Sequence, residues 1–488
     1  MKKAILTSFA ILCLLSTLFL MKYEIRAKAG TDVINVPTDY PTIQEAINAA
    51  ISGDTIFVHN GTYKEHVVVN KSVSLVGKHR DSTIVDGDGT GTVVSIMASH
   101  VSIRGFTITR SGKGPYNSGI FVDQSIGNDI SHNAITDSNN GINLYFSADN
   151  TVYGNRIMNN KDGISLYFSA DNTVYGNTIT DNSNGISLYF SADNTVYGNT
   201  ITDNYHGMYL VLYSKNNTIF CNNFNNIYQI SNDEKNVWDD GNQGNYWSDY
   251  AGQDGNGDGL GDLPYVIDPN NRDKHPLMGT FSILNVASES ETHQITTICN
   301  STISGFRFEI GTETGSKIIR FNVTGEVGTI GFCRVSIPTE LMNYPNIVLF
   351  DTEEIFPTLL NVSNNVHVCL YFTYPHSSHT VTIISSKTLF LYNELLDKHV
   401  KLQTDLYNLN TTYYDCLNNY NILLGNYTQL QKRYLELNNS YQNHLVDYSK
   451  NVRNIRNLMY ILAATTAIFI VTTIYLSKKA HASNSKLS

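Results

Sequence analysis

The feature that most constrains this chain is an internal repeat with a period of 22 residues. The twelve residues LYFSADNTVYGN recur unchanged at 144–155, 166–177 and 188–199. A period near 22 is too short for helical repeats and is typical of a solenoid in which each repeat forms one coil. Short runs of β-branched and aromatic residues alternate with Gly, Asn, Asp, Ser and Thr. The repeat therefore predicts a right-handed parallel β-helix.

The pattern within one repeat indicates which side chains are buried. Ile164, Leu166 and Phe168 occupy alternate positions of a strand, so we expect all three to point into the core. Asn177 and Asn182 fall at the bends between strands, and stacking places each above its equivalent in the next coil. Buried asparagines in such columns can bond the backbone of neighbouring coils, as amide ladders do.

Outward positions form columns of identical residues. Tyr145, Tyr167 and Tyr189 make one such column. The other columns are Tyr153, Tyr175 and Tyr197, and Asp149, Asp171 and Asp193. Aromatic side chains along a flat surface can stack on sugar rings, and nearby polar groups can bond sugar hydroxyls. The first column therefore predicts a carbohydrate site, and the alternative is that the tyrosines only stabilise the solenoid.

Apolar segments near both ends predict export and a membrane anchor. Residues 1–29 read as a signal peptide with an A-x-A cleavage site, and an uncleaved anchor is the alternative. Residues 458–477 form a predicted transmembrane helix, and the lysines that follow place a tail at 478–488 in the cytoplasm. The body would then be extracellular, and nine N-x-S/T sequons before the span agree with that. The net charge of −10 argues against nucleic acid as a partner.

Residues 30–277 carry a resemblance to a known family. The opening, VPTDYPTIQEAINAAISGDTIFVHNGTYKEHV at 36–67, includes a short amphipathic helix that would cap the first coil within 36–66. With the repeats and the stretch NYWSDYAGQDGNGDGLGDLPYVID at 245–268, it resembles the NosD-like, carbohydrate-binding and sugar-hydrolase (CASH) modules of archaeal surface proteins. The resemblance implies a pectate-lyase-like β-helix. It leaves the activity open, because that fold hosts lyases, hydrolases, esterases, epimerases and non-enzymes.

The catalytic motifs of those enzymes are not found in this sequence. No G-H-G motif of polygalacturonases and no D-F-I-F-G motif of esterases is present, and between 111 and 234 no basic residue recurs beside a carboxylate cluster. His132 and His206 are isolated, so we assign neither a catalytic role. The NosD name implies copper, but no Cys/His/Met cluster supports it. We therefore assign no catalytic residue.

The stretch 236–277 would close the β-helix with an aromatic cap. Trp247 has two interpretations, as part of the cap or as a sugar-stacking residue of the carbohydrate site. An acidic loop follows, which matches the first nine positions of a calcium loop through Asp254, Asn256, Asp258, Leu260 and Asp262. Tyr265 replaces the usual Glu at position twelve, and Asp268 is a candidate substitute. The pattern predicts a structural Ca²⁺ site, with a metal-free acidic turn as the alternative.

Two further regions precede the span. Residues 278–386 alternate apolar and polar positions and predict an immunoglobulin-like β-sandwich, in which Cys299–Cys333 is the favoured disulfide. Residues 387–457 carry tyrosine at position a and leucine at position d of a heptad repeat, with Cys416 at a d position. This pattern predicts a coiled-coil stalk and a parallel homo-oligomer, and a long single helix is the alternative.

These regions together support one function and one alternative. We expect a membrane-anchored cell-surface protein that presents its β-helix for binding glycans or neighbouring surface proteins. The alternative is a polysaccharide-active hydrolase, lyase or epimerase whose active site has no recognisable motif.

Overall fold

The structure is a computed structural model. The chain divides into two compact units, the first ending at Phe390 and the second beginning at Leu391. It describes residues 32–287, 292–312, 315–342, 347–364, 366–385, 387–442 and 448–484. The predicted signal peptide and the end of the predicted cytoplasmic tail lie outside these residues.

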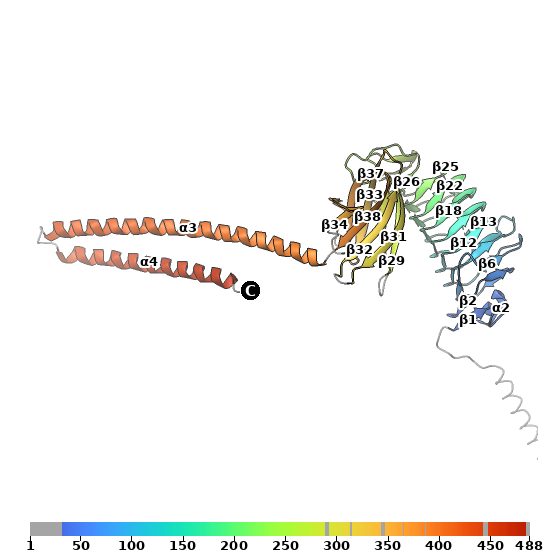
Figure 1. The fold of residues 1–488 in the computed structure, drawn as a ribbon, viewed down its shortest axis with the longest axis horizontal. Coiled ribbons are helices and arrows are strands. Elements are labelled where there is room, and N and C mark those ends of the chain that lie inside the picture. The colour runs from blue at the N-terminus through green and yellow to red at the C-terminus, as the bar shows by residue number, and fades with distance from the viewer. Residues whose placement is uncertain are drawn as a thin grey trace, which may run out of the picture. The chain divides into compact units, whose positions relative to one another are not determined.

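Three parallel sheets wind into a β-helix, and their strands recur once per coil (Figure 1). Sheet A contains β1 (Val33–Val36), β2 (Thr55–Val58), β5 (Ser74–Gly77), β8 (Ser102–Arg104), β11 (Asp129–Ser131), β14 (Thr151–Tyr153), β17 (Thr173–Tyr175), β20 (Thr195–Tyr197) and β23 (Thr218–Phe220). Sheet B contains β3 (Gly61–Tyr63), β6 (Thr83–Asp86), β9 (Thr107–Thr109), β12 (Ala134–Thr136), β15 (Arg156–Met158), β18 (Thr178–Thr180), β21 (Thr200–Thr202), β24 (Asn223–Asn225) and β26 (Tyr246–Trp247). Sheet C contains β4 (Val67–Val69), β7 (Val94–Ile96), β10 (Ser118–Asp123), β13 (Asn140–Tyr145), β16 (Asp162–Tyr167), β19 (Asn184–Tyr189), β22 (His206–Val211) and β25 (Tyr228–Asn232).

The register of the repeats confirms the predicted coil. In sheet C, Ile164 pairs with Ile186 and Leu166 with Leu188, and all four side chains are fully buried. Phe168 does not follow the prediction, because its side chain is 42% exposed. Its φ of +49° is a left-handed conformation that ends the strand and turns the ring outward. Alternation of apolar and polar residues does not reveal such a turn, so the prediction that Phe168 points inward is wrong.

Columns of buried asparagines join successive coils, as the sequence predicts. The Oδ1 atom of Asn177 accepts hydrogen bonds from the backbone N–H and the Nδ2 of Asn155, both at 3.0 Å. Its Nδ2 donates to the carbonyl oxygens of Val152 and Tyr175 and to the Oδ1 of Asn199. Each asparagine therefore satisfies backbone groups of its own coil and of the coil before it.

Both ends of the β-helix are capped. At the first coil, α2 (Ile43–Ala49) begins after Thr42, whose hydroxyl accepts from the N–H of Glu45. Its side chains Ile43, Ala46 and Ile47 are buried against the open end, as predicted. At the last coil, the antiparallel pair β27 (Tyr265–Asp268) and β28 (Asn271–Asp273) lies beside the two tryptophans of the chain.

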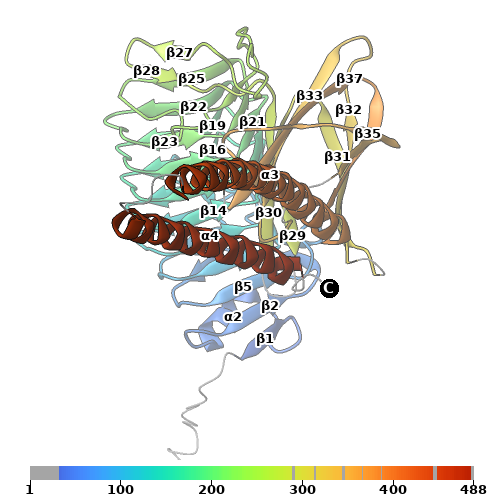
Figure 2. The ribbon, with the colours of Figure 1, turned by 90° about the vertical axis from the view of Figure 1, so that its left-hand side faces the viewer.

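A β-sandwich follows in the same unit and lies alongside the β-helix (Figures 1 and 2). One sheet has the order β29 (Thr280–Ala287), β30 (Thr292–Cys299), β33 (Ile330–Pro338), β37 (His367–Pro375) and β36 (Thr358–Leu359). The other has the order β31 (Thr302–Ile310), β32 (Lys317–Thr324), β38 (Ser378–Ser385), β34 (Ile347–Phe350) and β35 (Glu353–Ile355). The two sheets share one apolar core, which confirms the sandwich. The strand number and order differ from those of an immunoglobulin domain, so that part of the prediction is wrong.

The sandwich core holds the predicted cysteine pair. Cys299 of β30 and Cys333 of β33 lie directly opposite each other on antiparallel strands, and both are fully buried. Both thiols are free in this structure, so the disulfide stays a prediction. The register brings the predicted partners together, whereas Cys369 bonds the hydroxyl of Ser336 instead.

The second unit contains α4 (Tyr448–Asn484) and, from Leu391 on, α3 (Lys387–Gln442). The window Arg456–Ile474 of α4 is long and apolar enough to cross a membrane. Among the described side chains of α3, only Cys416, Tyr420, Leu423 and Tyr427 are partly covered. All four occupy a or d positions of the predicted heptad. The unbroken helix expected over 387–457 cannot be assessed across 443–447, which lie outside the described residues.

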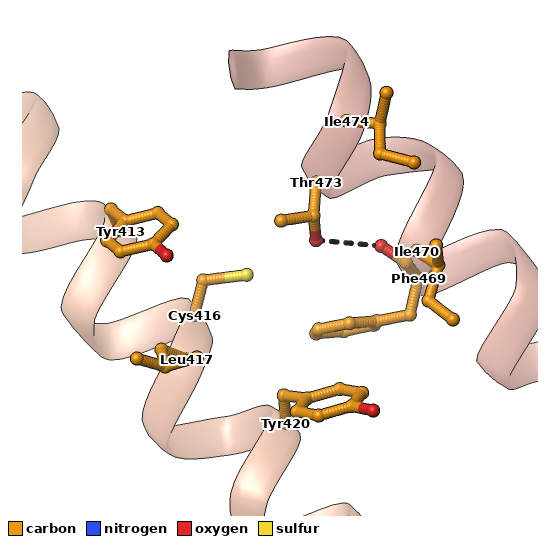
Figure 3. A pocket seen from close by; sticks show the side chains of 8 residues that line it. All are labelled: Tyr413, Cys416, Leu417, Tyr420, Phe469, Ile470, Thr473 and Ile474. Carbon is orange, nitrogen blue, oxygen red and sulfur yellow. Dashed lines mark hydrogen bonds between the residues drawn. The ribbon is translucent and has the colours of Figure 1, made fainter.

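The partly covered side of α3 faces α4. Figure 3 shows Cys416 and Tyr420 on one side of a small apolar cavity and Phe469 and Thr473 on the other. The cavity measures about 210 Å³. Its α4 wall is the candidate membrane span, so this cavity could not persist once the span is surrounded by lipid. We assign it no function.

Candidate functional site

The predicted tyrosine column lies on the outer face of sheet C. The rings of Tyr145 and Tyr167 stack at 5.5 Å with an angle of 9°, and Tyr189 continues the column at 6.1 Å. Beside it runs a second column of Phe146, Phe168 and Phe190, whose rings stack at 4.8 and 4.6 Å. The structure thus brings the three tyrosines together. Because neighbouring rings cover one another's faces, the columns present ring edges and hydroxyl groups to solvent rather than the faces that sugar stacking requires.

A polar cluster lies on the same face, at the other end of the strands. The Oδ1 atom of Asp162 accepts from the Nδ2 of Asn184 at 2.6 Å and from the hydroxyl of Ser187 at 2.9 Å. The Oδ1 of Asn184 in turn bonds the Nδ1 of His206 at 3.0 Å. Burial lowers the pKa of His206, which favours the neutral imidazole. No local motif marks this cluster in the sequence, because its members come from three successive coils at the spacing of the repeat.

A second tyrosine ladder lies at the edge of sheet A, where the chain turns into sheet B. Tyr153, Tyr175 and Tyr197 stack at 4.9 and 5.0 Å with angles of 3° and 5°. Burial, more than the neighbouring tyrosines and Asp129, raises the pKa of Tyr175 to about 12. Burial also raises the pKa of Tyr197. These phenols therefore stay protonated at neutral pH and can donate hydrogen bonds.

A column of glycines runs beside this ladder and leaves a recess. Gly154, Gly176 and Gly198 follow the three tyrosines directly and have φ values of +64°, +61° and +64°. A Cβ added at Gly176 would meet no atom closer than the backbone nitrogen of Gly154, at 4.0 Å. Glycine adopts this left-handed turn without strain, and at Gly176 the missing side chain also leaves open space above the backbone.

The β-sandwich closes this recess into a cavity of about 620 Å³. One wall is formed by Tyr153, Tyr175 and the threonines at 178 and 200, and the opposite wall is formed by β29 and β30. The β29–β30 wall consists of Phe281, Ser282, Ile283, Asn285, Thr292 and Gln294. His132 stands at one end, edge-on to Tyr153. We call this cavity the glycine trough, and none of the residues that line it is Asp, Glu, Lys or Arg.

Trp247 does not belong to an exposed binding surface. Its side chain is 1% exposed, and its ring stacks between Phe224 at 4.6 Å and Tyr265 at 4.3 Å. The Nε1 of Trp247 donates to the Oδ2 of Asp273 at 2.9 Å. Burial raises the pKa of Asp273 to about 6. Both faces of the Trp247 ring are covered, which favours its interpretation as part of the cap over the predicted sugar-stacking role.

The predicted calcium loop is folded around one of its own carboxylates. Asp254 accepts from the N–H groups of Gly257, Asp258 and Gly259, at 2.8 to 3.1 Å. Asp262 accepts from the N–H of Gly255, and Asp258 accepts from that of Leu260. Asn256 donates to Asp258. Among the described residues, no three His, Cys, Asp or Glu side chains gather closely enough to hold a metal ion.

The same loop contacts the β-sandwich, which sequence reasoning missed. The guanidinium of Arg334 donates from Nη1 to the carbonyl oxygen of Asp258 at 3.0 Å, and Arg334 is itself buried. Its positive charge lies beside the acidic loop and offsets part of the repulsion that a cation was expected to relieve. The calcium site stays a prediction, and the arginine is a competing source of countercharge.

The fold and its outward ladders define a class, the parallel β-helix proteins. Within that class, residues 47–252 match the family described as periplasmic copper-binding protein (NosD), so this segment is similar to the β-helices of that family. The described residues show no group of His, Cys, Asp or Glu that fits the metal in that description.

A curated relative and several solved structures are similar to parts of this chain. A cell surface glycoprotein of Methanothermus fervidus is 32% identical over 130 residues, which cover 26% of this chain and 21% of the relative. The chain thus spans about a fifth of that relative's length. An alginate lyase from a Paenibacillus species is 13% identical, with a TM-score of 0.30 over 43% of this chain and 96% of the lyase. A tailspike protein of the Acinetobacter baumannii bacteriophage Fri1 is 9% identical, with a TM-score of 0.26 over 74% of this chain and 85% of the tailspike. At these TM-scores, neither likeness bears on an activity of this chain.

Proposed function

We propose that this chain is a membrane-anchored cell-surface protein that presents its β-helix for binding carbohydrate or neighbouring surface proteins. The observation that carries the proposal is the pair of tyrosine ladders, which set rows of phenol hydroxyls in register along the solenoid. Hydroxyl donors at a regular spacing suit a ligand that is itself a repeating polyol. The similarity of 130 residues of this chain to part of a cell surface glycoprotein supports the location.

Anchoring rests on the apolar window of α4, with the tail after residue 477 in the cytoplasm. The sequon asparagines also support an extracellular body, because those whose side chains are described are all exposed. They are Asn60, Asn70, Asn216, Asn300, Asn322, Asn361, Asn410 and Asn426. In a membrane, α4 would leave α3, and the seam of α3 would be free to pair with the same seam of a second copy.

A glycan array probed with the full chain in detergent micelles tests binding. We expect retention on a subset of glycans, with no change in their length after incubation. A chain that binds no glycan and no component of the cell envelope would contradict the proposal.

A polysaccharide-active enzyme is the second candidate, and one observation favours it. Asp162 is a buried carboxylate, and Asn184 hydrogen-bonds both Asp162 and His206, whose neutral form is favoured, so a carboxylate and a base lie on one face, where each could exchange a proton with a substrate. Screening neutral and uronate polysaccharides for cleavage tests this candidate. Turnover that disappears in Asp162→Asn would establish it, and turnover that survives the substitution would exclude this cluster as the site.

A further inference from the structure

We propose that the glycine trough, between the β-helix and the β-sandwich, is the binding site for an uncharged oligosaccharide. This inference rests on the proposed carbohydrate-binding function and gives it a location and a ligand class. The sequence predicts a carbohydrate site at the outward tyrosine column of sheet C. The site proposed here is instead a recess between two walls.

Size and shape are the first argument. The trough measures about 620 Å³, which lies within the range of about 300–1,000 Å³ typical of small-molecule sites. The rings of Tyr145 and Tyr167 on sheet C stack on each other and lie on an outer face. A ligand in the trough would contact the β-helix and the sandwich at once and would lose more of its surface to protein.

The chemistry of the lining is the second argument. The walls offer hydroxyl and amide groups from Thr178, Thr200, Ser282, Asn285 and Gln294, together with the two tyrosines. Such groups can both donate to and accept from sugar hydroxyls. A polyanionic glycan would need cations to replace its water, and no lysine or arginine lines the trough. The lining therefore favours neutral sugars over uronates.

The apolar end of the trough is the third argument. Ile283 and Phe281 from β29 lie over Gly198, and they close the trough toward the C-terminal coils. They offer an apolar patch for the C–H face of one sugar ring, which the mutually stacked tyrosines cannot offer. The floor above Gly176 stays open because no side chain grows from Gly154 or Gly176.

The repeat itself supplies a substitution that fills the trough without breaking the coil. His132 occupies the position equivalent to Gly154 and Gly176 in an earlier coil, and it does so with a φ of +56°. Gly176→His therefore places a side chain that the fold already accepts into the open space. Gly315→His is the matched control, because Gly315 has a φ of +64° and open space around it in a sandwich loop.

A second variant removes a contact without touching the backbone turn. Gln294 is exposed on β30 and lines the sandwich wall, so Gln294→Ala should leave folding unchanged. Losing one hydrogen-bonding side chain should weaken binding by about three- to tenfold.

Isothermal titration of the full chain with neutral gluco-, manno- and galacto-oligosaccharides, and with matched uronate oligomers, tests the proposal. We expect the wild type and Gly315→His to bind a neutral oligosaccharide equally, and Gly176→His to bind it at least about tenfold more weakly. Binding that Gly176→His and Gln294→Ala both retain would overturn the trough and leave the proposed function standing on another face. Binding of uronates alone would overturn the ligand class. No binding of any oligosaccharide would overturn this inference together with the carbohydrate-binding part of the proposed function, and would leave binding of surface proteins as its remaining part.

Discussion

The β-helix and the helical region differ in how far the sequence of each determines what its segments pack against. In the β-helix, every strand pairs with the same strand of the next coil, and the asparagine columns fix that register from within. In α3, the partly covered residues form one narrow stripe, and most of the described side chains are exposed. A solenoid carries its own partner in the next repeat, whereas a single amphipathic stripe can pair with any complementary surface. The first arrangement is therefore determined by sequence, and the second would change if the proposed membrane anchor and oligomer form.

The largest expected effect is the loss of one asparagine from a column. Asn177→Ala removes the acceptor for two donors of Asn155 and the donor to two backbone carbonyls, all in a buried setting. Each unsatisfied buried group costs about 1–3 kcal/mol, so we expect the free energy of unfolding to fall by about 3–5 kcal/mol. Urea unfolding measures the change. Asn225→Ala is the control, because Asn225 is exposed on β24 and should change stability by less than about 0.5 kcal/mol. Equal effects would mean that the ladder does not hold the coils together.

The cap of the β-helix should respond to pH through Asp273. Burial raises its pKa from 3.8 to about 6, so between these values the folded protein binds a proton that the unfolded chain has released. The folded state therefore loses stability as pH rises from about 4 to 6, by about 3 kcal/mol in all. Asp273→Asn replaces the carboxyl group with an amide that does not titrate in this range. The amide oxygen can still accept the hydrogen bond from the Nε1 of Trp247.

The pH effect is measured as a difference between variants. Relative to the wild type, Asp273→Asn should gain about 3 kcal/mol of unfolding free energy between pH 4 and pH 7. Asp240→Asn, at an exposed position of the same cap, serves as the control and should show no such trend. A constant difference between Asp273→Asn and the wild type would show that Asp273 is already charged at pH 4.

Calcium is expected to have a smaller effect on the same end of the β-helix. A loop without the Glu at position twelve should bind weakly, with a Kd of about 10⁻⁴–10⁻³ M. At about 10 mM Ca²⁺, binding to the folded state alone would add about 1.4–2.7 kcal/mol. A chelator should therefore lower the melting temperature, and Asp258→Ala should abolish the response. Melting curves that coincide with and without Ca²⁺ would leave Arg334 as the countercharge of a metal-free turn.

We expect the smallest effect on stability for α3. Its packing partner, unlike that of a β-helix strand, is expected to change in the membrane. Cys416 lies on the covered stripe and faces α4 in the structure (Figure 3). If the membrane withdraws α4, Cys416 should face a second copy, and mild oxidation of the full chain in its membrane should give a crosslinked dimer. Cys416→Ser is the control that should stay monomeric under the same conditions. A wild type that stays monomeric as well would contradict the parallel oligomer.

Most of the β-helix could be predicted from the sequence, because equivalent positions of successive repeats carry similar residues and so show repeatedly which positions are buried. It missed the outward turn of Phe168, since alternation carries no information about a left-handed residue at the end of a strand. The candidate site was predicted only in part. The ladder of Tyr153, Tyr175 and Tyr197 was visible in the sequence, but its opposing wall comes from β29 and β30, more than 80 residues further along the chain. Contacts between the β-helix and the sandwich do not follow the 22-residue repeat, so no pattern within the sequence predicts them. Trp247 was placed in the right region, but its burial depends on Phe224 and Tyr265 together.

Hydrogen exchange of the full chain, with and without a bound neutral oligosaccharide, tests most directly where the ligand is held. Slowed exchange is expected for backbone amides at 176–178 and 198–200 of the β-helix and at 281–285 and 292–294 of the sandwich, which together surround the glycine trough. Amides of sheet C at 145–147 and 167–169 should exchange at unchanged rates. Protection confined to sheet C, with none in β29 or β30, would contradict the account.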